Sequence, residues 1–289
     1  MGFAIALTAG TTFATTSSPS GGGTVSYNNG AAGTFYFDDP KYVLVTPVAG
    51  DTVVITGITK NNTGGGGLNE ALNGGSDGNA TGSWTMELHG NTLTGAPASG
   101  IDALIKTTNG TLTIDTTGAA ANIFNRGGLV GETATSGNLI MNIGADTFNT
   151  PGALNGITAN SAGTLTLNSL ATITVAGAGR GISATSTGVG AAGLVTLGTL
   201  NGGIKGTITA TAGTGIWVSG PGIVGTINNL TIGSTGVINA ATGIQVAGGH
   251  FTVDNFGSIT GTTAALAESN NSNTTSPAPF ELVLPEVWF

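Results

Sequence analysis

The stretch 156–182 reads GITANSAGTLTLNSLATITVAGAGRGI and contains every element of a repeat that runs through much of the chain. It opens on a Gly-Ile pair, continues through Gly163-Thr-Leu-Thr-Leu167 and Ile173-Thr-Val175, and ends on the next Gly-Ile pair. Apolar residues and Thr alternate in both inner segments, which is the pattern of short strands with one buried face. Gly, Ala and Asn fill the intervals, and Gly and Asn supply the backbone angles that tight corners need.

Equivalent units precede and follow this stretch. Pairs of Gly and an aliphatic residue begin at Gly100, Gly128, Gly156, Gly181, Gly215 and Gly243, with spacings of 28, 28, 25, 34 and 28 residues. Copies of the second element begin at Gly82, Gly110, Gly137, Gly163, Gly193 and Gly249. Three short strands in about 28 residues are too few for a propeller blade, and the Gly and β-branched content disfavours helical repeats.

Each unit therefore predicts one coil of a right-handed parallel β-helix, so we expect an all-β solenoid with coils of about 28 residues. Within a coil, Leu165 should point inward while Thr164 and Thr166 point outward. Successive coils stack about 4.8 Å apart. Leu112, Leu165 and Val195 should therefore form a buried ladder.

Composition divides the chain into four parts. Residues 1–20 predict a leader or the remnant of a signal peptide, although no Lys or Arg precedes their apolar run. Residues 21–58 are richer in aromatic side chains and fit the repeat poorly, which predicts strands that cap the solenoid. The β-helix should occupy 59–267, followed by a linker and apolar tail at 268–289. We expect the 34-residue unit to carry an inserted loop over 183–193.

The composition excludes several function classes. Only 7% of the residues are charged, and the six Lys and Arg side chains are too few and scattered to bind nucleic acid or an anionic membrane surface. The absence of Cys excludes disulfides and thiolate metal sites, and two His make zinc improbable, so we predict no metal and no cofactor. No apolar run approaches the roughly 20 residues of a membrane helix, so we predict no direct membrane insertion.

Catalytic groups are sparse, and we predict no catalytic residue and no enzyme activity. The only adjacent acidic residues, Asp38 and Asp39, precede Pro40 in a predicted turn. His89 and His250 should lie at a strand edge and at a corner. The remaining isolated acids are expected to be displayed outward: Asp102, Asp115, Asp146 and Asp254. The alternative of a polysaccharide-active enzyme needs two carboxylates within about 5–10 Å.

Two features predict a ligand-binding surface. Trp217 stands between two apolar residues of Gly215-Ile-Trp-Val218, so it should point outward, where it can stack on a sugar ring or pack under a neighbouring loop. Outward Thr recurs along the strands, and we select Thr111, Thr113, Thr164 and Thr166 as ligand-binding candidates. Aligned Thr rows can bind ice or a repetitive polymer, but Thr is also what an outward strand position takes where charge is avoided.

Two segments carry a resemblance to a known family. Gly243-Ile-Gln-Val246 is followed by Val253-Asp-Asn-Phe-Gly-Ser-Ile-Thr-Gly261, and Gly215-Ile-Trp-Val218 is followed by a looser copy, Ile227-Asn-Asn-Leu-Thr-Ile232. With its neighbours over residues 82–262, this pattern resembles the passenger region of bacterial autotransporters and haemagglutinin-like adhesins. The resemblance implies a membrane β-barrel beyond the passenger, or export by another route.

The family implies a location outside a Gram-negative cell or on its surface. We therefore expect a secreted or cell-surface passenger that acts as an adhesin or display scaffold without catalysis. Its partners would be a host or cell-surface glycan or protein, or another copy of itself. The alternatives are a structural stalk or self-associating filament subunit, and a polysaccharide-active enzyme on the same fold.

Overall fold

The structure is a computed structural model that describes residues 14–17, 22–28, 35–64, 69–75, 80–97, 101–199, 203–221, 227–268 and 281–283. Within these residues all regular secondary structure is β-strand, except one 3-10 turn at Gly190–Gly193. The predicted all-β class is confirmed. Of the predicted leader and C-terminal linker, only 14–17, 268 and 281–283 are described.

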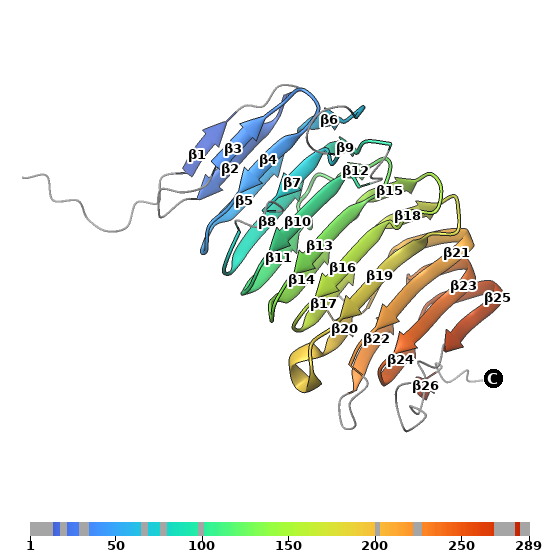
Figure 1. Cartoon of the computed structure of the whole chain (residues 1–289). Coiled ribbons are helices and arrows are strands. Elements are labelled where there is room, and N and C mark those ends of the chain that lie inside the picture. Colours follow the sequence, from blue (N-terminus) through green and yellow to red (C-terminus); the bar gives the residue numbers. More distant parts are fainter. Residues whose placement is uncertain are drawn as a thin grey trace, which may run out of the picture.

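The strands lie in three rows, and from β5 onward each row contributes one strand to each successive unit of the chain (Figure 1). The first row is an 11-stranded sheet. In sheet order its strands are β1 (Ala14–Ser17), β2 (Thr24–Asn28), β5 (Thr52–Thr56), β8 (Trp84–His89), β11 (Thr111–Asp115), β14 (Asn138–Ile143), β17 (Leu165–Ser169), β20 (Val195–Leu197), β22 (Asn228–Ile232), β24 (Phe251–Asn255) and β26 (Glu281–Val283).

The second and third rows belong to one 15-stranded sheet. The second row contains β6 (Thr59–Asn61), β9 (Thr92–Thr94), β12 (Ile123–Phe124), β15 (Thr147–Thr150) and β18 (Thr172–Val175). The third row contains β3 (Phe35–Asp38), β4 (Val43–Thr46), β7 (Leu72–Gly74), β10 (Ala103–Thr107), β13 (Leu129–Thr133), β16 (Ile157–Ser161) and β19 (Arg180–Ser186). The two rows join in long strands that belong to both, β21 (Thr207–Ser219), β23 (Val237–Gly248) and β25 (Ser258–Glu268).

Parallel pairing dominates, as the sequence predicts. It begins at β4 and β5, which pair in parallel with β7 and β8. Before that point, β1 with β2, β2 with β5 and β3 with β4 pair antiparallel. These antiparallel strands cover the N-terminal end of both sheets, whereas β25 pairs only with β23 among the described strands.

The recurring Gly-aliphatic pairs have a steric origin in the third row. Leu129, Ile157, Ile182, Ile216 and Ile244 are mutually in register and fully buried. A Cβ on the preceding Gly181 would lie 2.2 Å from Cγ2 of Ile208 in the second row. The same clash, at 2.4 Å, recurs between Gly215 and Ile238. The glycine is therefore required by the close approach of two rows.

Apolar ladders fill the interior. Leu112, Leu139, Leu165 and Val195 are in register in the first row, which confirms the predicted ladder. In the second row, the rings of Phe124 and Phe148 stack with centroids 4.5 Å apart and planes inclined by 6°. All six side chains are fully buried. Alternation of apolar and polar residues along each strand thus produces one continuous core.

Three details of the predicted repeat are wrong. Ile101 is out of register, because Ala103 and not Ile101 pairs with Leu129. The expected inserted loop over 183–193 begins later, because β19 continues to Ser186. The offset between paired residues rises from 25 at Ile157–Ile182 to 30 at Leu165–Val195 and 35 at Thr172–Thr207, so the extra residues are divided between two corners.

Two acids expected on the surface are buried. Asp146 is fully buried and ends a ladder of corner side chains: Nδ2 of Asn91 donates to Oδ1 of Asn122 at 2.9 Å, and Nδ2 of Asn122 donates to Oδ1 of Asp146 at 3.0 Å. The hydroxyl of Thr116 donates to Oδ2 of Asp146. Burial raises the pKa of Asp146, although these hydrogen bonds oppose the rise.

Asp102 is also fully buried, but its partners are all backbone amides. Its Oδ1 accepts the N–H of Gly95 at 2.6 Å, and its Oδ2 accepts those of Arg126, Gly127 and Gly128 at 2.8, 3.2 and 3.1 Å. Burial raises the pKa of Asp102, and the four N–H bonds oppose the rise. The carboxylate therefore holds two corners of the chain together and is not displayed.

Candidate functional site

A groove of about 360 Å³ lies on the outer face of the third row. Residues from β10, β13, β16 and β19 form its floor, and the corner that follows these strands forms one wall. Its volume falls within the range of about 300–1,000 Å³ that is usual for small-ligand sites. The lining residues are Lys106, Thr107, Glu132, Thr133, Ala134, Asn160, Ser161, Thr185 and Thr187.

The floor of the groove is a column of one polar residue from each strand. Lys106, Glu132, Asn160 and Thr185 are mutually in register. Nζ of Lys106 lies 2.5 Å from Oε2 of Glu132, and Nδ2 of Asn160 donates to Oε1 of Glu132 at 3.2 Å. The side chains of Lys106 and Glu132 are 35% and 32% exposed, so they remain accessible to a ligand.

The hydroxyls of the corner wall are committed to the backbone. Oγ1 of Thr133 donates to the carbonyl of Gly137 at 2.6 Å, and Oγ of Ser161 donates to that of Thr164 at 2.8 Å. Both side chains are buried and hold the corner in place. The free hydrogen-bonding capacity of the groove therefore lies on its floor.

One end of this face carries a cation stacked on an aromatic ring. The Cζ atom of Arg180 lies 4.0 Å from the centroid of the Trp217 ring, and Nη1 of Arg180 donates to Oγ of Ser183 at 3.1 Å. Ser183 is in register with Trp217 and lies two residues before Thr185 of the groove floor. Burial lowers the pKa of Arg180, because the guanidinium is partly withdrawn from water.

The structure separates the predicted ligand-binding residues into two sets. Thr111 and Thr113 lie on β11, and Thr166 lies on β17, all half-buried on the outer face of the first row. Thr113 and Thr166 share one column but are separated by Ile140 of β14. Thr164, also half-buried, immediately precedes β17. Trp217 lies on the other sheet, so it does not join the four threonines.

The residues weighed for catalysis have structural contacts. Oδ1 of Asp38 lies 2.5 Å from Nζ of Lys60, whose side chain is fully buried, and the carbonyl of Asp39 accepts from the same Nζ at 2.7 Å. The carbonyl of His250 accepts from the backbone and side-chain nitrogens of Asn228. His89 lies 3.6 Å from Glu87 at the end of β8. None of these groups lines the groove.

The column of polar residues on the groove floor was not predicted from the sequence, although the spacing of these residues in the repeats would have revealed it. Lys106, Glu132, Asn160 and Thr185 each lie three residues after an inward residue of the third-row ladder, which is Ala103, Leu129, Ile157 and Ile182 respectively. Aligning the repeats on those inward residues would have placed the four side chains in one column. Their chemical types differ, so no motif of identical residues marked them.

Comparison with known proteins identifies no relative, so the function has to be inferred from the fold and the groove. No family model matches the chain, and neither the curated proteins nor the solved structures contain a significant match. Among the described residues, no cluster of three or more His, Cys, Asp or Glu could hold a metal ion. The same part of the chain has no helix of the length and apolar character that a bilayer crossing requires.

Proposed function

We propose that the chain is a right-handed parallel β-helix that serves as an extracellular or cell-surface binding scaffold, in the manner of an autotransporter passenger or adhesin. The parallel rows, their offsets of about 28 residues and the continuous core support the coil architecture. Right-handedness follows from the general preference of parallel crossovers. The passenger assignment rests on the resemblance of the repeats.

The observation that carries the binding function is the groove on the third row, whose floor is a column of polar side chains. Four successive coils each contribute one floor residue, and the ion pair of Lys106 with Glu132 lies half-exposed between them. Such a row of accessible polar groups suits an elongated ligand that runs along the stack of coils. Catalysis is not part of the proposal, because Glu132 is the one carboxylate among the described residues that line the groove, and two are needed for glycoside hydrolysis.

Binding to intact cells tests this function. We would measure retention of the fluorescently labelled chain on Gram-negative and host cells, and compare a Glu132→Ala/Asn160→Ala variant with a Thr113→Ala/Thr166→Ala variant. Loss of binding in the groove variant alone is the expected result. Loss in the threonine variant alone would transfer the site to the first row, and absence of binding by the native chain would reject the adhesin function.

The second row favours one other candidate function, the binding of ice. Its outward positions carry no charge over eight successive rungs, and most of them are Thr or Asn. These residues are Thr59, Asn61, Thr92, Thr94, Ile123, Asn125, Thr147, Asn149, Thr172, Thr174, Thr207, Thr209, Val237, Asn239, Ser258 and Thr260. Adjacent rungs lie about 4.8 Å apart, which gives an array of regular spacing. Thermal hysteresis of the purified chain that is lost in Thr172→Lys would support this function, and its absence would exclude it.

A further inference from the structure

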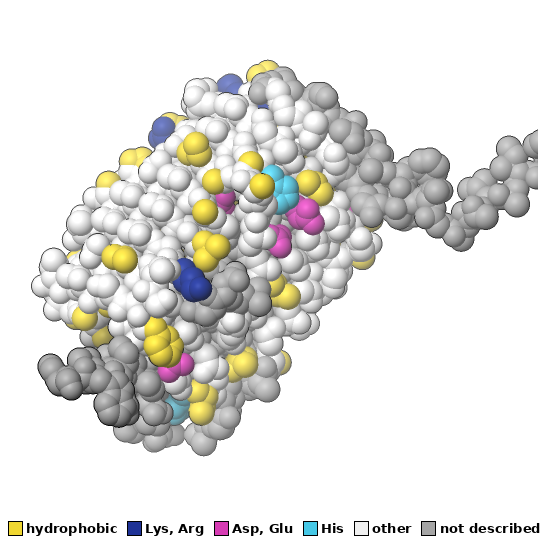
Figure 2. All heavy atoms as spheres, turned by 180° about the vertical axis from the view of Figure 1, so that it is seen from behind, with side chains coloured by type: hydrophobic (Ala, Val, Ile, Leu, Met, Phe, Trp, Pro, Cys, Tyr) yellow, Lys and Arg dark blue, Asp and Glu magenta, His cyan; other side chains and the backbone are white. Residues whose placement is uncertain are grey.

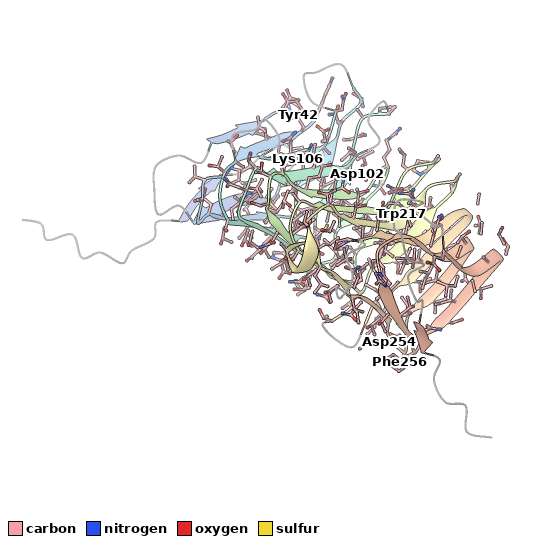
Figure 3. The ribbon with its side chains drawn as sticks, turned by 60° about the horizontal axis from the view of Figure 1, so that its bottom comes forward. Tyr42, Asp102, Lys106, Trp217, Asp254 and Phe256 are labelled. Atoms are coloured by element: carbon pink, nitrogen blue, oxygen red, sulfur yellow. The ribbon has the colours of Figure 1, made fainter. Side chains whose placement is uncertain are left out.

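The groove and the Arg180–Trp217 stack form one continuous face. Ser183, which accepts a hydrogen bond from Arg180, and Thr185, the last residue of the floor, are two residues apart on β19. Both point outward, so their side chains are about 7 Å apart. A ligand that follows the floor from Lys106 to Thr185 therefore reaches the guanidinium. Figure 3 shows Lys106 in the middle of the ribbon and Trp217 towards its C-terminal part.

The charges on this face are unequal at its two ends. Among the described residues, the ion pairs are Lys60–Asp38, His89–Glu87 and Lys106–Glu132, and none includes Arg180. Lys106 and Glu132 neutralise one another, which leaves the guanidinium as the uncompensated charge. On the side of the molecule opposite to that of Figure 1, charged side chains are also few (Figure 2). A local positive site thus exists on a chain whose net charge is −8.

Stacking fixes the orientation of this cation. The ring of Trp217 lies under the guanidinium and Ser183 accepts from one of its nitrogens, so the plane of the group is held. The remaining N–H donors form a rigid fork that matches the two oxygens of a carboxylate. A partly dehydrated guanidinium also forms stronger hydrogen bonds to an anion than an exposed one.

The floor beside this cation suits hydroxyl groups. The carboxylate of Glu132 retains acceptor sites, Asn160 carries an amide, and Thr185 carries a hydroxyl that can donate or accept. An extended peptide is disfavoured because the N–H and C=O groups of these strands are engaged with their neighbours in the sheet.

We propose that this face binds a linear oligosaccharide that carries carboxylate groups, with one carboxylate on Arg180 and sugar hydroxyls on Glu132, Asn160 and Thr185. This inference rests on the proposed binding function and names the class of ligand. A uronic acid chain has both required groups along its length. The neutral pair of Lys106 with Glu132 accommodates its hydroxyls without repelling a carboxylate further along the groove.

Calorimetric titration with tetragalacturonate, and with its fully methyl-esterified form as a neutral match, tests the inference. We expect the acid to bind and esterification to weaken binding about ten- to hundredfold, the loss usual for a hydrogen bond to a charged group. Arg180→Gln should cause a similar loss, and Arg180→Lys a smaller one because it keeps the charge but not the fork. Lys205→Gln, which removes one positive charge outside the groove, should leave the affinity unchanged.

Equal affinity for the acid and the ester would overturn the assignment to acidic sugars, as would equal losses in Arg180→Gln and Lys205→Gln. A thermal melt of each variant separates loss of binding from loss of folding, and Arg180→Lys provides a second variant if Arg180→Gln does not fold. If neither oligosaccharide binds but the native chain still binds cells through Glu132 and Asn160, the ligand class is wrong and the proposed function stands. If cell binding also fails, both are wrong.

Discussion

Asp102 and Asp146 are both fully buried, yet replacement by Asn should destabilise the fold much more at position 102 than at position 146. At position 146 an amide continues the ladder begun by Asn91 and Asn122, because its oxygen can accept from Asn122 and its nitrogen can donate to the hydroxyl of Thr116. At position 102 the carboxylate is surrounded by four N–H donors. An amide nitrogen there would face the N–H of Gly95 with no acceptor for either group.

The magnitude follows from these contacts. A buried donor left without a partner costs about 1–3 kcal/mol, so we expect Asp102→Asn to lower the free energy of unfolding by about 2 kcal/mol. For a large domain each kcal/mol lowers Tm by about 2–4 °C, which gives a decrease of roughly 4–8 °C. For Asp146→Asn the hydrogen bonds from Asn122 can be kept and the new amide nitrogen can donate to Oγ1 of Thr116, so only the hydroxyl hydrogen of Thr116 loses its acceptor, and the cost at neutral pH should be smaller, about 1 kcal/mol.

The pH dependence gives a second readout for Asp146. Burial raises its pKa in the folded chain above the ordinary value of 3.8, so the protonated carboxyl is favoured on folding. Its stabilising contribution is therefore present below about pH 4 and is lost as the pH rises through the folded pKa. The stability of the native chain relative to Asp146→Asn should decrease over that interval and remain constant above it.

Thermal melts of the native chain and both variants, recorded by circular dichroism between pH 3 and 7, provide the assay. Equal destabilisation by Asp102→Asn and Asp146→Asn at pH 7 would refute the distinction between the two sites. In this distinction Asp102 is surrounded by N–H donors, whereas Asp146 ends a ladder of side chains that can accept an amide. A stability difference between the native chain and Asp146→Asn that grows in favour of the native chain with rising pH would contradict the direction of the pKa shift.

Three further substitutions test the packing, each by chemical denaturation. Phe148→Ala removes a ring stacked on Phe124 and should cost about 3–5 kcal/mol, whereas Phe148→Leu should cost less than about 1.5 kcal/mol; equal costs would contradict a closely packed second row. Gly181→Ala places a Cβ 2.2 Å from Ile208 and should cost about 1–3 kcal/mol, while no loss would show that the rows are further apart. Lys60→Met removes the buried ammonium that faces Asp38 and should cost about 3 kcal/mol, part of which Lys60→Met/Asp38→Asn should restore; no recovery would argue against that ion pair.

The sequence predicted those features that depend on alternation along one strand. Leu165 and Leu167 alternate with Thr, so their burial and their ladder partners followed from the period of two residues. The Gly before each aliphatic residue was recognised as a marker of the repeat. Its steric reason was not, because the clash of a Cβ at Gly181 is with Ile208, which belongs to another row.

The candidate site depends on contacts between residues of different repeat units, and these contacts could not be predicted from the sequence. Arg180 and Trp217 are 37 positions apart and meet only through the register set by the long unit after Ile182. Asp102 was expected on the surface because an isolated acid has no visible partner in the sequence. Its four partners are backbone amides, which leave no side-chain signature.

The stacking of coils is the central claim, and distances between spin labels along the first row test it most directly. The chain has no Cys, so label pairs can be introduced cleanly as Thr85→Cys combined with Thr166→Cys, Thr196→Cys or Thr252→Cys. These positions lie three, four and six rungs from Thr85. The account predicts backbone separations of about 14, 19 and 29 Å, an increase of about 4.8 Å per rung. Distances by electron spin resonance that do not increase linearly with the number of rungs would contradict it.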